Sequence, residues 1–143
     1  MELTTFTMVI RFTLQLEEQA AKFYRDAAAS SQLAQAKEVF TKFAENSEKR
    51  KKELERTARE SVDHSLLEPV SGLFEETYTM NTILLKGGSI SDTIAVAKQL
   101  EERMQKFYVE AGEKINFISN VSRLYKRCAQ DRTKALTALQ DFA

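Results

Sequence analysis

Residues 15–24 read QLEEQAAKFY, and residues 99–108 read QLEERMQKFY. In both stretches Gln-Leu-Glu-Glu is followed by Lys-Phe-Tyr, and the second copy lies 84 residues after the first. Apolar residues on either side of each copy recur at the three- and four-residue spacing of an amphipathic helix. We therefore predict two equivalent helices that arose by internal duplication.

Helical periodicity covers four segments of the chain. The expected helices span about residues 4–30, 33–61, 91–115 and 117–142. The break between the first two is so short that they should be antiparallel neighbours, and the same holds for the last two, which are separated by a turn near 112–116. Ser91 and Asp92 are residue types that favour the N-cap of the third helix.

A stretch of different character, residues 62–90, separates the two pairs of helices. It contains Pro69, Gly72 and the pair Gly87-Gly88, which interrupt regular structure, and a short helical piece is expected within 73–85. A connection of this length suits a bundle whose second and third helices are joined by a crossover. The sequence predicts an all-α, antiparallel four-helix bundle built from two helical hairpins and a long crossover.

This pattern describes a single domain covering residues 1–143, in which the repeat comprises 4–61 and 91–142. One proline and four glycines argue against a β-sandwich or barrel, since those folds need many turns. Basic and acidic residues number 21 each, so we expect neither a nucleic-acid partner nor an anionic membrane surface. The only cysteine, Cys128, leaves no intramolecular disulfide, and without an apparent leader or membrane span we expect a cytoplasmic location.

Glu17 and Glu101 occupy the same position in the two copies of the repeat. At about 100° per residue, apolar residues of the same helix lie within about 40° of each glutamate, so both should point into the core. A buried carboxylate without partners costs several kcal/mol. The sequence therefore predicts a shared central polar site that supplies a cation, a proton or hydrogen-bond donors.

The repeated Glu-x(4)-Lys-Phe-Tyr pattern, with Tyr24 and Tyr108 seven residues after the two glutamates, resembles the rubrerythrin-type branch of the ferritin-like proteins. The resemblance extends over nearly the whole chain. It implies a ferritin-like bundle in which the first and third helices each give a Glu and the other two each give a Glu-x-x-His pair, together holding two irons. Such centres oxidise ferrous iron or reduce peroxide and oxygen.

The second and fourth helices depart from that pattern. Counting along the family motif places its ligand positions at Ser47 and Arg50 in the second helix, and at Cys128 and Asp131 in the fourth. A shift of one residue would give Glu48 and Lys51 instead, but Glu48 then lies about 100° from the centre of the apolar stripe. The only histidine, His64, lies in the crossover and is expected at the surface.

We therefore expect no bound metal and a degenerate di-iron site, with iron as the alternative cofactor. Arg50 is predicted to be the internal cation, its guanidinium bridging Asp131 and one or both glutamates. Three acids against one arginine would leave excess negative charge, so at least one carboxyl should be protonated or accept a hydrogen bond from Tyr24 or Tyr108.

Three functions remain open. The first is a non-catalytic scaffold or interaction protein, expected as a homodimer through apolar crossover residues such as Leu66, Leu67, Val70 and Phe74. The second is an oxidoreductase whose altered site holds one Fe, Mn or Zn ion through Glu17, Glu101, Asp131 and Cys128. The third is a thiol role for Cys128, although a cysteine on a core stripe is usually an apolar filler and Asp131 would raise its pKa.

Overall fold

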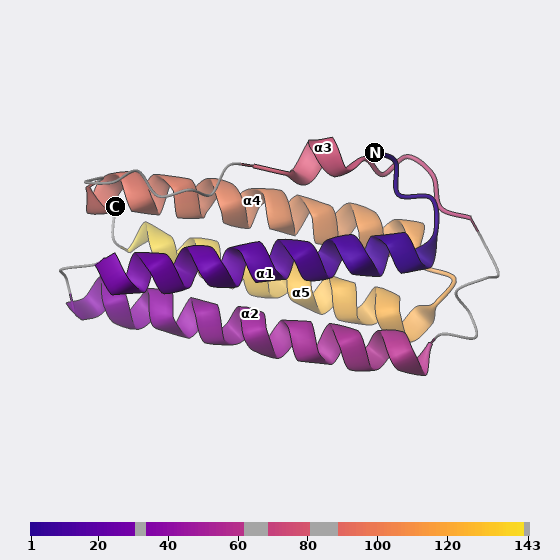
Figure 1. Cartoon of the computed structure of the whole chain (residues 1–143), viewed down its shortest axis with the longest axis horizontal. Helices are drawn as coiled ribbons and strands as arrows, with labels where there is room; N and C mark the ends of the chain where they lie inside the picture. Colours follow the sequence, from indigo (N-terminus) through magenta and orange to yellow (C-terminus); the bar gives the residue numbers. More distant parts are fainter. Residues whose placement is uncertain (31–33, 62–68, 81–88, 142–143) are drawn as a thin grey trace.

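The computed structural model describes residues 1–30, 34–61, 69–80 and 89–141. Within these ranges the helices are α1 (Phe6–Ser30), α2 (Ala34–Glu60), α3 (Glu75–Tyr78), α4 (Ile90–Lys114) and α5 (Ser119–Gln140). Four long helices lie side by side, and the short α3 rests beside α4 (Figure 1). The predicted all-α bundle is confirmed.

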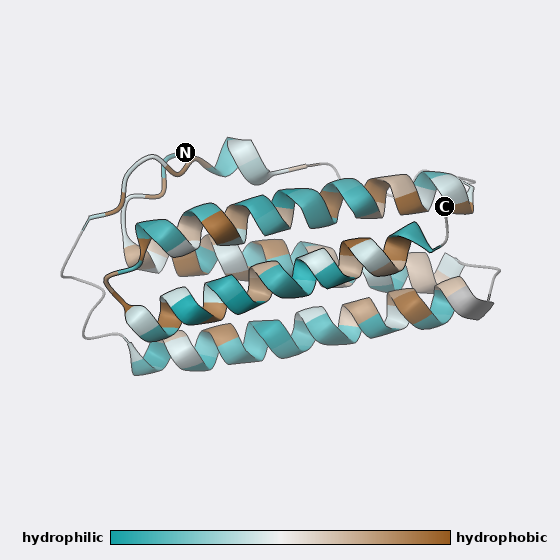
Figure 2. Ribbon diagram, turned by 180° about the vertical axis from the view of Figure 1, so that it is seen from behind, coloured by the Kyte–Doolittle hydropathy of each residue, from teal (hydrophilic) through white to brown (hydrophobic). Residues whose placement is uncertain are grey.

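The bundle consists of two antiparallel hairpins, α1 with α2 and α4 with α5, and packing is most extensive within each hairpin. The chain leaves α2 at one end of the bundle and enters α4 at the other, so the link between them spans its length as predicted (Figure 1). Each long helix alternates hydrophilic and hydrophobic residues along its turns, as expected of helices that bury one face (Figure 2).

The start of α4 differs from the prediction by two residues. Ser89, not Ser91, is the N-cap: its Oγ accepts from the Asp92 backbone nitrogen at 3.2 Å, and its own nitrogen donates to Asp92 Oδ2 at 3.4 Å. This reciprocal capping box requires an acceptor three residues after the cap, and Asp92 meets that condition for Ser89. Ser91 therefore lies inside the first turn.

The turn between the last two helices also lies later than expected, because α4 continues through Gly112 to Lys114. Gly112 is buried where α4 meets α5, and a Cβ added there would lie 3.2 Å from the Tyr125 Cβ. The glycine is thus explained by close packing between two helices rather than by a chain reversal.

The described part of the crossover holds the N-terminal segment against the bundle. Leu3 donates its backbone N–H to the Leu73 carbonyl at 2.8 Å, and Val70 donates to the Thr4 carbonyl at 2.9 Å. Gly72 has a φ of 83°, a left-handed conformation that favours glycine. Of the longer helical piece expected within 73–85, the four residues of α3 are helical, and residues 81–88 lie outside the described ranges.

The predicted apolar surface on the crossover is only partly observed. Val70 is 3% exposed and belongs to the core, so its assignment to an exposed surface was wrong. Phe74 is 46% exposed. Leu66, Leu67 and His64 lie outside the described residues. No helix in the described part of the chain is long and apolar enough to cross a membrane.

Candidate functional site

Glu17 on α1 and Glu101 on α4 are both fully buried, each at 0% exposure. Tyr24 of α1 donates its hydroxyl to Glu101 Oε1 at 2.6 Å, and Tyr108 of α4 donates to Glu17 Oε1 at 3.0 Å. Each helix therefore supplies the tyrosine that serves the glutamate of the other. This exchange is what two equivalent helices would produce, and the duplication itself stays a prediction.

Arg132 on α5 is the cation at the centre of the site. It is 1% exposed, and its Nη1 donates to Glu101 Oε1 at 2.8 Å while its Nη2 donates to Glu17 Oε1. One guanidinium thus joins the two buried glutamates, which come from different helices. Burial opposes the charge of Arg132, but attraction from Glu101 and Glu17 outweighs it and raises its pKa well above the ordinary value.

Sequence reasoning missed Arg132, although helical phase contained the signal. Arg132 follows Cys128 by four residues, which places it about 40° from that core position, whereas Asp131 lies about 60° away on the other side. Counting along the family motif directed attention to Asp131. In the structure the Asp131 side chain is 38% exposed, and that of Arg132 is buried.

Arg50 on α2 is a second cation at the edge of the site rather than its single internal one. Its Nε lies 3.2 Å from both carboxylate oxygens of Glu17, and its Nη1 is 3.9 Å from Asp131 Oδ2. Its side chain is 12% exposed, and it makes no hydrogen bond to Glu101 within the described residues. The two buried carboxylates are thus matched by two guanidinium groups. The prediction of excess negative charge around a single arginine was therefore wrong for the buried groups.

The positions that the resemblance assigns to bridging carboxylates hold small buried side chains. Ser47 is 0% exposed and its Oγ accepts from Arg50 Nη2 at 3.3 Å. Cys128 is 1% exposed, and burial, with the neighbouring Glu17 as the next cause, raises the pKa of its thiol to about 12. The thiol is therefore protonated at neutral pH.

Glu48 and Lys51, the pair of the alternative register, lie on the outer side of α2. The Glu48 side chain is 41% exposed and accepts from Arg25 Nη1 at 2.9 Å, while Lys51 donates to Glu18. This surface ion-pair network links α1 to α2. It does not reach the buried glutamates.

The two inward tyrosines act as hydrogen-bond donors over the whole practical pH range. Burial, together with the nearby Glu101, raises the pKa of Tyr24 well above its ordinary value. Burial, together with the nearby Glu17 carboxylate, likewise raises the pKa of Tyr108 well above its ordinary value. Both hydroxyls therefore stay protonated and satisfy carboxylate oxygens.

Two polar atoms of the cluster have no hydrogen-bond partner among the described residues: Glu101 Oε2 and Arg132 Nε. Leaving a buried donor or acceptor without a partner costs about 1–3 kcal/mol. The cluster therefore keeps one free acceptor and one free donor inside the bundle.

These residues do not fit a pair of irons. Both carboxylates are already held by guanidinium groups, Ser47 cannot supply a bridging charge, and the Cys128 thiol keeps its proton. Within the described ranges, no three His, Cys, Asp or Glu side chains gather into a group that could hold a metal. The alternative set of Glu17, Glu101, Asp131 and Cys128 is thus not assembled as a metal site there.

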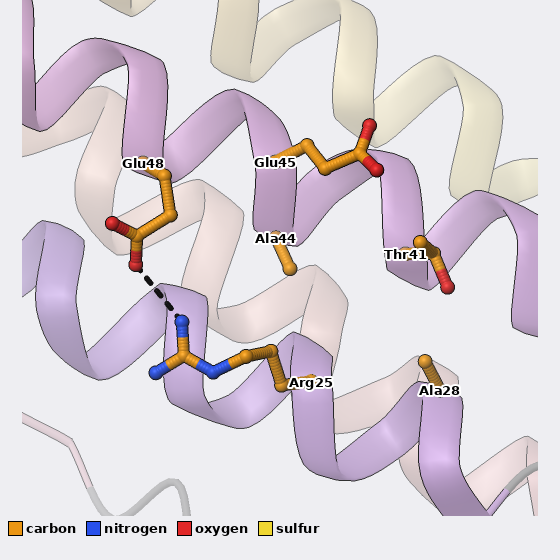
Figure 3. A pocket seen from close by; sticks show the side chains of 6 residues that line it. All are labelled: Arg25, Ala28, Thr41, Ala44, Glu45 and Glu48. Carbon is orange, nitrogen blue, oxygen red and sulfur yellow. Dashed lines mark hydrogen bonds and ion pairs between the residues drawn. The ribbon is translucent and has the colours of Figure 1, made fainter.

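Among the described residues, two hollows lie on the surface of the bundle. The larger, of about 550 Å³, lies between α2 and α5 and has Arg50 and Glu101 among its lining residues. The smaller, of about 310 Å³, lies between α1 and α2 over Ala28 and Ala44. Figure 3 shows the Arg25–Glu48 ion pair at one side of this smaller hollow, with Glu45 pointing away from it. Of these two hollows, the larger alone is lined by residues of the buried cluster.

A comparison with protein-family models gives a match to the model described as Rubrerythrin over residues 9–133. That range includes the glutamates and tyrosines that α1 and α4 contribute to the buried cluster, Glu17, Tyr24, Glu101 and Tyr108. It also includes Arg50 and Arg132. No curated protein and no solved structure matched the chain significantly.

Proposed function

Because the chain belongs to the rubrerythrin family, we propose that it is a member in which buried ion pairs have replaced the di-iron centre. In this proposal the bundle is a non-catalytic scaffold or interaction protein. The observation that carries it is the single buried guanidinium of Arg132 hydrogen-bonded to both Glu17 and Glu101.

Electrostatics supports this replacement. An arginine side chain cannot be deprotonated in a protein, so Arg132 stays a fixed positive charge beside the two carboxylates. Two unit charges 4 Å apart interact by about 4 kcal/mol at an effective dielectric constant of 20, and a divalent ion doubles that repulsion. A metal at the glutamates would have to displace both Arg132 and Arg50 from the core.

The cluster is well suited to fixing how the helices pack. It takes Glu17 from α1, Arg50 from α2, Glu101 from α4 and Arg132 from α5, so one network of ion pairs touches every long helix. Buried ionic networks of this kind can specify the alignment of helices even where they add little net stability. A scaffold with a fixed shape is the function that this arrangement serves best.

A homodimer is part of the proposal. Phe74, just before α3, and Val109, on α4, are each 46% exposed, and α3 packs on α4. Large apolar side chains at a surface are often covered by a partner. Sedimentation velocity at micromolar concentration should give a dimer, and a Phe74→Ser/Val109→Ser variant should sediment as a monomer. A wild-type monomer would remove this part of the proposal.

The enzymatic alternative is tested by activity after metal loading. The protein is incubated anaerobically with ferrous iron, and iron oxidation is then followed on addition of oxygen and, separately, of hydrogen peroxide. We expect rates equal to those of a buffer blank with the same iron. Oxidation faster than the blank, lost in a Glu101→Gln variant that remains folded, would support an oxidoreductase with an altered carboxylate site.

A further inference from the structure

The outer face of α4 carries a row of exposed residues that the interior of the bundle does not use. We propose that this face is a dimer contact, in which α4 packs antiparallel against α4 of a second copy of the chain. The inference rests on the homodimer proposed above, and it specifies which helix forms the contact and in what register. It does not depend on the chemistry of the buried cluster.

Six residues form one stripe along this face of α4. They follow one another at alternating intervals of four and three residues, and all are exposed: Ala95, Gln99, Glu102, Lys106, Val109 and Glu113. At about 100° per residue the stripe is about 80° wide, and its centre lies opposite the buried Met104. Alternating steps of three and four residues also occur along the seam of a coiled coil. A second helix can therefore lie along the whole stripe.

The charges of the stripe are not used within the described part of the chain. None of its ion pairs there includes the three charged residues of the stripe, Glu102, Lys106 and Glu113. The flank of α4 that meets the crossover differs in this respect. There Arg103 donates to the Thr79 carbonyl at 2.6 Å, and Glu110 accepts from the Tyr78 hydroxyl at 2.8 Å. The outer stripe thus keeps its charges for a partner.

Charge complementarity indicates that the partner is an antiparallel copy of the same helix. A contact between two copies about a twofold axis must be self-complementary. A parallel dimer would set Glu102 opposite the partner's Glu102 and Lys106 opposite the partner's Lys106, and these like charges repel. An antiparallel dimer with its axis level with residue 104 sets Glu102 opposite the partner's Lys106, twice by symmetry. Opposite charges then meet at the centre of the contact.

The same register suits the outer residues of the stripe. Val109, which is 46% exposed, faces the partner's Gln99, an uncharged side chain. Glu113 faces the partner's Ala95, which is small and leaves its carboxylate at the edge of the contact. No charged residue of the stripe then faces a charge of the same sign.

Neighbouring registers are less favourable. An axis between residues 107 and 108 would set Glu102 opposite the partner's Glu113, and the two carboxylates would repel. An axis between residues 100 and 101 would place Val109 beyond the partner's stripe and leave it uncovered. The register centred on residue 104 is the one that pairs the central charges and also covers Val109.

Phe74 lies beside this contact rather than at its centre. Residues on either side of it in the crossover lie against the C-terminal part of α4. A Cβ added to Gly72 would lie 3.1 Å from Lys114 Nζ, and Tyr78 donates to Glu110. These two α4 residues lie about 60–100° around the helix from the centre of the stripe. The exposed Phe74 ring therefore flanks the contact, where a second copy can cover it.

Charge reversals test the contact, with the full chain followed by sedimentation velocity at micromolar concentration. Lys106→Glu and Glu102→Lys should each weaken dimerisation at least about tenfold, because each sets like charges opposite one another at the centre. An equimolar mixture of the two variants should recover the dimer, since every central pair is again of opposite sign. The matched control Arg11→Glu, an exposed charge reversal on α1, should dimerise like the wild type.

Disulfide formation tests the register. In the proposed dimer residue 99 faces the partner's residue 109, whereas two residues ten apart on one helix lie about 15 Å apart, too far for a disulfide within one chain. A Gln99→Cys/Val109→Cys variant should therefore form covalent dimers under mild oxidation, and neither single substitution should do so. The native Cys128 is 1% exposed, so we expect it to take no part.

The outcomes separate this inference from the homodimer on which it rests. A dimer that survives both charge reversals, or covalent dimers from Val109→Cys alone, would overturn the proposed contact and leave a homodimer formed in another way. A mixture of the two charge variants that stays monomeric would overturn the pairing of Glu102 with Lys106. A wild-type chain that sediments as a monomer would remove both the homodimer and this contact.

Discussion

Replacing Arg132 by methionine should destabilise the bundle more than any other single substitution in the cluster. Methionine keeps the length and apolar stem of the side chain but removes the charge. Glu101 then keeps one donor, the Tyr24 hydroxyl at 2.6 Å, and loses the one cation that pairs with it among the described residues. Glu17 keeps Arg50, whose Nε lies 3.2 Å away, and the Tyr108 hydroxyl.

The magnitude follows from this asymmetry. Removing one partner of a buried ion pair costs about 3–5 kcal/mol because the other charge stays buried. Glu101 bears most of that cost, so we expect a loss of about 4 kcal/mol in the free energy of unfolding. For a chain of 143 residues this corresponds to a fall of about 12 °C in Tm.

Urea denaturation followed by circular dichroism measures the change directly. An Arg123→Met variant serves as a control on the exposed side of α5, where substitution should change stability by no more than about 0.5 kcal/mol. An Arg132→Met/Glu101→Gln variant should recover about 2 kcal/mol of the loss, since it no longer buries the unmatched carboxylate. Arg132→Met with the stability of the wild type would refute the reasoning.

Three further predictions concern the same cluster. Arg50→Met should cost about 1–3 kcal/mol in urea denaturation, less than the loss of Arg132, because Glu17 keeps its second cation; an equal or larger cost would contradict this ranking. Tyr24→Phe should lower Tm by more than Tyr108→Phe, because the carboxylate served by Tyr24 has a single cation and a free oxygen; the reverse order would count against the network as described. Burial raises the pKa of the Cys128 thiol to about 12, so its labelling by a disulfide reagent at pH 8 should be slow in the native protein and fast in urea, whereas rapid native labelling would show an accessible thiolate.

Much of the fold could be predicted from the sequence because helical periodicity is a strong signal in long amphipathic segments. The two hairpins, the crossover and the inward direction of Glu17 and Glu101 all follow from it. Helix ends were less accurate. The start of α4 depends on which serine has an acceptor three residues later, and the end of α4 depends on close packing at Gly112.

The site was only partly predictable for a different reason. The repeated motif identifies the two glutamates and two tyrosines, since each copy supports the other. Arg132 has no counterpart in the rubrerythrin motif used above. In a sequence, moreover, a buried arginine cannot be told from a surface arginine by residue type. Its helical phase, about 40° from Cys128, was the available signal. The exposure of Asp131, by contrast, depends on how closely α5 approaches α2, which sequence spacing does not specify.

The most direct test of the central claim, that arginines have taken the place of the metals, is the metal content of the protein. Elemental analysis is carried out on the purified protein, and again after anaerobic loading with ferrous iron and removal of the excess. The Arg132-bridged cluster predicts no iron above background in either sample. About two irons retained per chain would contradict it, and would mean that both guanidiniums leave the glutamates to admit a working di-iron centre.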